Sequence, residues 1–112
     1  MPWISGRSTR ILTHERARAG HRSVMEATLA VARRASLAAS VTRAQEGWSE
    51  HGGARVASQV ELSDDLPLII EIVGATERIE AALPDLIALA AAHGTITLTE
   101  TRLWAPDEPP RS

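Results

Sequence analysis

The residue types best suited to binding a small anion lie in and around the segment 46–55. The segment holds three glycines in seven residues, and backbone N–H groups beside glycine can approach a phosphate closely. Arg43 and Arg55 flank the segment and could hold an anion through paired hydrogen bonds. Trp48 could stack on a base or anchor a partner protein. The predicted ligand contacts here are Arg43, Glu46, Gly47, Trp48 and Arg55. The alternative is a solvated hairpin loop with one exposed tryptophan.

Glu71 is a second candidate, because it is the one acidic residue in the apolar run 67–73. A carboxylate among branched aliphatic side chains is expected to be paired or to line a cleft between subunits. Arg102, near the end of the chain, is a possible partner. Glu71 and Arg102 therefore join the predicted ligand-binding residues, and both interpretations of Glu71 stay open.

The sequence predicts no catalytic residue, metal site or cofactor. The four histidines are scattered and lack the spacing of a metal site. Asp64 and Asp65 could hold Mg²⁺ or serve as a general acid, but a turn before a strand uses aspartate for its own hydrogen bonds. The absence of cysteine excludes disulfides and thiolate metal sites. Neither a P-loop nor a dinucleotide-binding motif is present.

Charge and composition narrow the possible partners. The formal net charge is −2, yet residues 1–55 carry nine arginines against four acids, and residues 56–112 carry three against ten. Such asymmetry marks an anion-binding face or complementary subunit surfaces, or else the halves neutralise each other within one fold. Only three residues are aromatic, which argues against nucleic-acid binding by base stacking. No apolar run reaches the ~18 residues of a membrane span, and no secretory signal is visible, so we expect a cytoplasmic protein.

Two helices are expected to position these residues. A capping-box pattern starting at Ser23, followed by apolar residues at helical spacing, predicts a helix over 23–35. Thr76 is the predicted N-cap of the second helix, and Gly94 should terminate it in the left-handed C′ position. Pro84 lies within that helix and should kink it or split it in two.

The remaining periodic segments are predicted to be β-strands. They span 7–13, 37–45, 68–73 and 95–104, and Pro67 suits a strand start. The βαβ unit then occurs twice, which predicts an α+β, ferredoxin-like βαββαβ sandwich: an antiparallel sheet with two helices on one face. We expect one domain over 7–104, an N-terminal extension over 1–6 and a disordered tail over 105–112.

The outer face of this sheet is expected to need cover. Ile70, Ile72 and Val41 are apolar, and we expect that they cannot all face the helices. An oligomer that covers the bare face is therefore predicted.

Several segments of the sequence resemble those of a bacterial family of small PII-like proteins, the domain of unknown function 190. The segment from Leu62 to Val73 resembles the family's "LSEDLPVVIEIV", and the segment from Ile79 to Pro84 resembles "IEAFLP". Val41 to Trp48 is similar to "VTRGIEGFG". The resemblance covers about residues 11–104. Family glycines are replaced here by Ser36, Ala39, Ala44 and Ser49.

The resemblance implies a PII-like trimer that regulates rather than catalyses. It further implies a small anionic effector, such as a nucleotide, in clefts between subunits, and a 46–55 loop that relays binding to a target protein. Some members are encoded beside fluoride exporters, which suggests an ion-transport partner. One alternative is a small ferredoxin-fold enzyme with His51 or Glu71 as base. Another is a structural assembly subunit without ligand.

Overall fold

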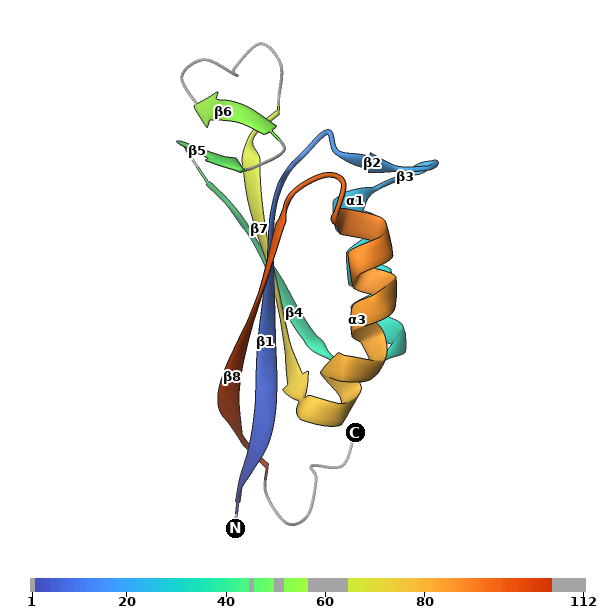
Figure 1. Cartoon of the computed structure of the whole chain (residues 1–112), viewed down its shortest axis with the longest axis vertical. Helices are drawn as coiled ribbons and strands as arrows, with labels where there is room; N and C mark the ends of the chain where they lie inside the picture. The colour runs from blue at the N-terminus through green and yellow to red at the C-terminus, as the bar shows by residue number, and fades with distance from the viewer. Residues whose placement is uncertain (1, 45, 50–51, 57–64, 106–112) are drawn as a thin grey trace.

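The computed structural model describes residues 2–44, 46–49, 52–56 and 65–105. It shows a four-stranded antiparallel sheet in the order β4-β7-β1-β8, with both helices packed on one face (Figure 1). The predicted α+β, ferredoxin-like architecture is therefore confirmed. The main elements are β1 (Trp3–His14), α1 (Val24–Arg34), β4 (Ala38–Arg43), β7 (Pro67–Ala75), α3 (Thr76–Ala90) and β8 (Thr95–Trp104).

The strand register decides which side chains reach the core. β1 is a central strand, and Ile11 lies opposite Ile70 of β7 on one side and Ile96 of β8 on the other. Side chains directly opposite each other share a face of the sheet. Among the described residues, the largest fully buried side chains are apolar residues of the sheet and both helices, with two threonines: Thr9, Ile11, Val24, Thr28, Ile70, Ile72, Ile79 and Leu86.

This register contradicts the reason given above for an oligomer. Val41 lies opposite Ile70, and both Ile70 and Ile72 are fully buried in the core that the helices cover. Val41 packs against the same core. Ile70 and Ile72 lie two apart in β7 and therefore share one face, which is the face that the helices cover. Val41 lies directly opposite Ile70 and points to the same face.

The first helix follows its predicted capping. The Ser23 hydroxyl accepts a hydrogen bond from the Glu26 N–H at 3.0 Å, and α1 spans Val24–Arg34. At its other end Ser36 has φ = 57°, the left-handed conformation. The Ser36 N–H donates to the Arg33 carbonyl and the Leu37 N–H to the Ala32 carbonyl, which is the Schellman arrangement. Ser36, which replaces a family glycine, thus occupies a position that favours glycine.

The second helix differs from expectation at two points, its N-cap and Gly94. Its N-cap is Ala75, and Thr76 is already helical, with its hydroxyl 3.0 Å from that of Ser5. Of the two outcomes expected at Pro84, a kink or a split, the split does not occur, since α3 continues through Pro84. Gly94 is not left-handed. Its backbone packs against the Leu12 carbonyl, and a Cβ at this position would overlap that carbonyl.

Four short strands complete the described chain. β2 (Arg18–Ala19) and β3 (Arg22–Ser23) form a two-residue ribbon before α1. β5 (Glu46–Ser49) and β6 (Gly52–Val56) form an antiparallel pair within the segment 46–55 that was expected to be a loop. β1 begins at Trp3, four residues before the predicted start. The predicted tail lies outside the described residues from residue 106 onward.

Candidate functional site

The β5–β6 hairpin extends from the end of the sheet where β4 stops and β7 starts (Figure 1). Its backbone pairing places Glu46 opposite Val56 and Gly47 opposite Arg55. The hairpin therefore brings four of the predicted ligand residues into one short ribbon: Glu46, Gly47, Trp48 and Arg55. The fifth, Arg43, is the last residue of β4, immediately before the hairpin.

Arg43 is held at the base of this hairpin by an ion pair. Its guanidinium Nε contacts Oε1 of Glu15, which directly follows β1. The Arg43 side chain is 64% exposed, whereas that of Glu15 is 21% exposed, and Oε1 itself is buried. An anion that binds Arg43 must therefore share the guanidinium with Glu15. The two Nη atoms of Arg43 carry four further N–H groups, which could serve an anion while Nε contacts Glu15.

A second polar contact ties β1 to the start of β7 at the same end of the sheet. Nδ1 of His14 lies 2.8 Å from Oδ1 of Asp65, and the backbone N–H of Arg16 donates to the same oxygen at 3.1 Å. The Glu15 N–H donates to the Leu66 carbonyl at 3.0 Å. These contacts fix the connection into β7 directly below the hairpin. Asp65 thus bonds across the fold, to the end of β1 and the residues after it.

Glu71 is paired, but not with the residue suggested by the sequence. Its Oε2 accepts hydrogen bonds from Nε of Arg10 at 2.9 Å and from the Ser8 hydroxyl at 3.2 Å. Arg10 lies directly opposite Glu71 in the sheet. The hydrogen bond from Arg10, then that from Ser8, lowers the pKa of Glu71. A carboxylate held ionised in this way is a weak proton acceptor, which disfavours Glu71 as a catalytic base.

Arg102 lies away from Glu71, and the suggested pair does not form. Arg102 is opposite Ser5, five positions along β1 from the partner of Glu71, and on the opposite side of β1 from β7. Its guanidinium carbon stands 5.8 Å from the centroid of the Trp3 ring. The predicted ligand residues thus separate into three places: the hairpin and its base, the outer sheet face at Glu71, and the far sheet end at Arg102.

The outer sheet face is polar at its centre and apolar around it. Ser8, Arg10 and Glu71 occupy the centre, and the threonines of β8 adjoin them. Partly exposed aliphatic side chains share this face, by register: Leu12, Ile69, Val73 and Leu103.

Two absences hold for the described residues. No group of three or more histidine, cysteine or acidic side chains among them could hold a metal ion. None of the helices in the described ranges is long and apolar enough to cross a membrane.

Sequence reasoning missed Arg10, His14 and Glu15 as members of these clusters. Each meets a partner far away in the chain: Arg10 with Glu71 across 61 positions, and His14 with Asp65 across 51. No local pattern marks such a residue. The period-2 alternation of β1 could have placed Arg10 on the outer face, but only once Ile11 and not Leu12 was known to face the core.

Comparison with known proteins identifies the same architecture. The model of the DUF190 family, described as an uncharacterized ACR, matches residues 7–103. No curated protein matches the chain.

Several solved structures share the fold. The nitrogen regulatory PII-like protein CPII from Thiomonas intermedia, bound to ADP, AMP and bicarbonate, superposes with a TM-score of 0.68 at 16% identity, covering 93% of this chain and 92% of CPII. CPII bound to ADP and bicarbonate gives 0.65 at 17% identity, with 93% of each chain covered. A candidate PII-like signaling protein from Thermus thermophilus gives 0.59 at 13% identity, covering 94% of this chain and 93% of its own. These similarities confirm the PII-like fold.

Proposed function

The chain belongs to the DUF190 family, and from this membership we propose that it is a PII-like regulatory protein that binds a small anionic effector without catalysing a reaction. The observation that carries the proposal is the β5–β6 hairpin, which projects from the sheet beside Arg43 and carries Arg55 in its second strand. Adenine nucleotides are the first effectors to test, because CPII is bound to ADP and AMP in structures of the same fold.

The hairpin is the proposed relay to a target protein. Arg43 links the hairpin to the end of β1 through its ion pair with Glu15. The Ala44 N–H donates to the Pro67 carbonyl at 2.9 Å, so Ala44 bridges β4 and β7 at the base of the hairpin. An effector that competes with Glu15 for Arg43 would alter this base, and the hairpin would follow. The target remains unassigned, with an ion-transport protein as one candidate and the cytoplasm as the expected location.

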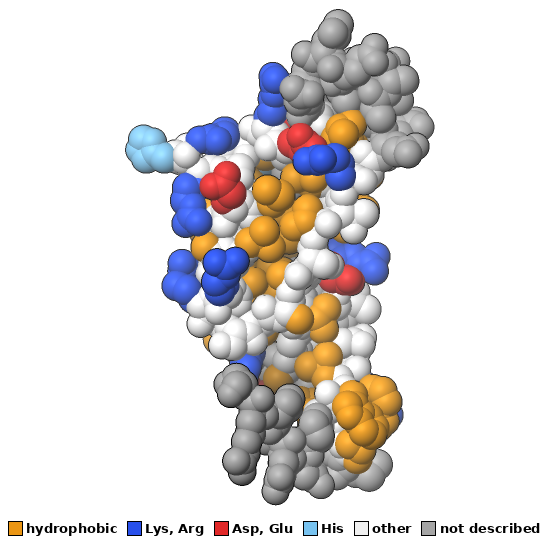
Figure 2. Space-filling model, turned by 180° about the vertical axis from the view of Figure 1, so that it is seen from behind, with side chains coloured by type: hydrophobic (Ala, Val, Ile, Leu, Met, Phe, Trp, Pro, Cys, Tyr) orange, Lys and Arg blue, Asp and Glu red, His pale blue; other side chains and the backbone are white. Residues whose placement is uncertain are grey.

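A homotrimer is the proposed assembly, with the effector in clefts between subunits. The distribution of charge supports this trimer. Residues 16–34 carry five arginines and one acid, whereas residues 76–104 carry four acids and two arginines. Figure 2 shows several Lys or Arg side chains along one side of a central hydrophobic band, with others at the top and on the opposite side. In a cyclic assembly each subunit presents one side to the other side of its neighbour, so opposite charges would meet.

A thermal-shift panel of nucleotides, bicarbonate and other simple anions tests the effector. A ligand that binds only the folded state stabilises it by roughly 2.7 kcal/mol at a hundredfold excess over Kd. We expect a rise in Tm with one anion and its loss in Arg43→Ala and Arg55→Ala. Arg34→Ala on α1 is the matched control and should keep the rise.

Each variant must be compared with its own ligand-free Tm, because Arg43→Ala also leaves the buried Glu15 oxygen without its cation. No rise with any anion would contradict the proposal and favour a structural assembly subunit. A rise that all three arginine variants retain would place the effector elsewhere on the molecule.

A further inference from the structure

The sheet end opposite the hairpin carries a pocket that the proposed function does not use. Within the described chain Trp3, Ile4 and Ser5 of β1 pair only with β8, because pairing with β7 begins at Gly6. This two-stranded ribbon therefore projects past the rest of the sheet. The same three residues precede residue 7, where the match to the family model begins. The ribbon is thus a feature that family membership does not explain.

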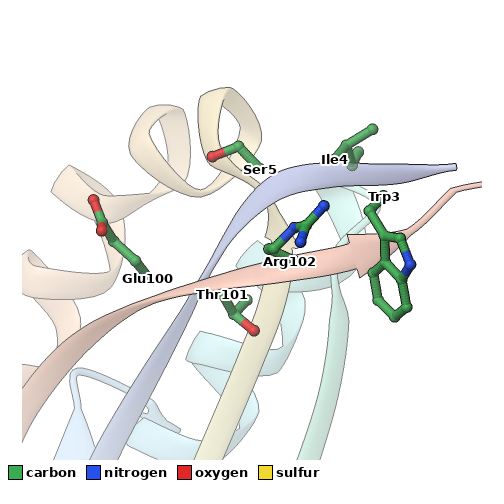
Figure 3. Close-up of a pocket in the computed structure, with 6 residues that line it drawn as sticks. All are labelled: Trp3, Ile4, Ser5, Glu100, Thr101 and Arg102. Carbon is green, nitrogen blue, oxygen red and sulfur yellow. The ribbon is translucent and has the colours of Figure 1, made fainter. Parts of the chain in front are cut away.

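An open pocket of about 510 Å³ lies along this ribbon, within the size range of small-molecule sites (Figure 3). Its lining combines two apolar residues, two residues with hydroxyl groups and two unlike charges: Trp3, Ile4, Ser5, Glu100, Thr101 and Arg102. Four of these share one face of the ribbon by register, since Trp3 and Ser5 alternate in β1 and Arg102 lies opposite Ser5, two residues from Glu100. One aromatic ring, one cation and one carboxylate therefore belong to the same face.

Glu100 and Arg102 are the two charged groups of this pocket, and they do not neutralise each other. Their positions in β8 put their Cα atoms roughly 7 Å apart. Figure 3 shows both side chains rising from the same side of β8 and diverging, with Arg102 directed toward Trp3. Within the described residues neither forms an ion pair. The pocket thus holds two separate charges of opposite sign.

The nearest groups leave both charges able to bind a ligand. Arg7 lies directly opposite Glu100, but its Nη2 already contacts Oε1 of Glu80 on α3 at 3.2 Å. The guanidinium carbon of Arg102 stands 5.8 Å from the centroid of the Trp3 ring. A ring contact of this kind leaves the N–H donors of an arginine available to a carboxylate.

The pair of unlike charges restricts the kind of ligand that the pocket can take. A simple anion is repelled by Glu100, and a simple cation is repelled by Arg102. A zwitterion satisfies both, because its carboxylate pairs with Arg102 and its ammonium group with Glu100. In an α-amino acid the two groups are attached to one carbon, and a hydrogen bond of ~2.9 Å at each end lets so small a molecule bridge the two side chains.

We propose that this pocket binds a free α-amino acid with an apolar side chain, as a second ligand distinct from the anionic effector at the hairpin. Arg102 holds the carboxylate, Glu100 holds the ammonium group, and the apolar side chain packs on the Trp3 ring, which is 45% exposed. Trp104 fixes this ring by an edge-to-face contact, with centroids 5.3 Å apart and planes at 81°. The aromatic wall is therefore in place before the ligand binds.

Ligand-observed NMR titrations of the full chain with charge analogues of one amino acid test the site. At pH 7 L-leucine carries both charges, N-acetyl-L-leucine only the negative one and L-leucinamide mainly the positive one. We expect L-leucine to bind with a Kd of roughly 1 mM, as suits a small ligand in an open pocket, and both analogues to bind about tenfold more weakly or worse. Equal binding of either analogue would overturn the zwitterion site. No saturable binding of L-leucine, L-methionine or L-phenylalanine would overturn it as well.

Substitutions that remove one charge at a time locate the ligand, with circular dichroism as the check on folding. Arg102→Gln and Glu100→Gln should each weaken the binding of L-leucine about tenfold, because each loses a charge-assisted hydrogen bond. Arg34→Gln and Asp85→Asn, on exposed helix positions, are the matched controls and should keep the natural Kd. Arg43→Ala should also keep it, which separates this site from that of the effector. Unchanged binding in both pocket variants, or equal losses in the controls, would overturn the proposal.

Discussion

At the scale of single residues, the outer sheet face depends on one carboxylate. Glu71 accepts hydrogen bonds from Arg10 and Ser8, and both contacts favour its ionised form. Because the pKa of Glu71 is lowered in the folded chain, its ionisation stabilises the fold above the unfolded pKa of about 4.3. This contribution to stability disappears as the pH falls through the pKa of Glu71 in the folded chain.

The Glu71→Gln variant tests this linkage. We expect a lower Tm than that of the natural chain at pH 7, and a difference that shrinks as the pH falls below about 4.3, where the unfolded state takes up the proton. Thermal unfolding followed by circular dichroism from pH 7 to pH 3 measures it. Arg10→Gln should lose the same pH-dependent part. A difference in Tm that stays constant with pH would contradict the assignment.

Ser36 carries a cost that glycine would remove. It holds the left-handed position of the Schellman motif at φ = 57°, a conformation that costs a residue with a Cβ roughly 1 kcal/mol. We expect Ser36→Gly to raise the free energy of unfolding by up to about 1 kcal/mol, measured by urea denaturation. Ala35→Gly is the matched control, because Ala35 has φ = −86° and gains nothing from glycine there. Equal effects at both positions would argue against strain at Ser36.

At the scale of elements, close packing determines how the connection from α3 to β8 passes over β1. The backbone at Gly94 leaves no room for a Cβ beside the Leu12 carbonyl, so the connection from α3 to β8 rests directly on β1. The Thr13 hydroxyl donates to the His93 carbonyl at 2.9 Å and fastens the same connection. Gly94 is therefore required for contact between elements and not for a left-handed turn.

Two alanine substitutions distinguish these roles of glycine. Gly94→Ala should lower the free energy of unfolding by roughly 2–4 kcal/mol, because backbone atoms must move. Gly20→Ala should cost only about 1 kcal/mol, since Gly20 has φ = 67° but open space around it. Urea denaturation measures both. A smaller loss for Gly94→Ala than for Gly20→Ala would contradict the packing argument.

Patterns among residues close together in the sequence predicted the helices and strands, whereas the contacts between those helices and strands could not be predicted. The bounds of β8 and the Ser23 cap follow from residues close together in the chain, and both are confirmed. The partner of Glu71 depends on the register between strands 61 residues apart, which the sequence leaves undetermined. The glycines at 47, 52 and 53 suggested a loop because they permit many conformations, yet pairing between β5 and β6 selects an extended one.

At the scale of the whole molecule, the uncovered sheet face should show whether chains associate. Thr99 lies on this face opposite Ser8 and is exposed in the single chain. An exposed polar-to-charged change normally alters stability by less than ~0.5 kcal/mol. If the proposed trimer packs on this face, however, the same change would bring unpaired carboxylates into a buried interface.

Thr99→Glu should therefore dissociate the trimer while leaving the chain folded. Light scattering coupled to gel filtration measures the mass, and circular dichroism checks the fold. Ala88→Glu, on the exposed side of α3, is the matched control and should keep the natural mass. A natural chain that is monomeric at micromolar concentration would overturn the trimer, and an unchanged mass in Thr99→Glu would exclude this face as the interface.

The central position of β1 has a consequence for how the protein is made. β1 is the first strand synthesised, yet its two neighbours, β7 and β8, start at Pro67 and Thr95. At 5–20 residues per second, a ribosome needs roughly 5–20 s to pass from His14 to Trp104. Until β7 is complete at Ala75, β1 has no strand to pair with inside its own sheet, and its second neighbour is complete only at Trp104. The nascent chain is thus exposed to mispairing between neighbouring ribosomes on one message, and completion of the sheet must await release of its last strand.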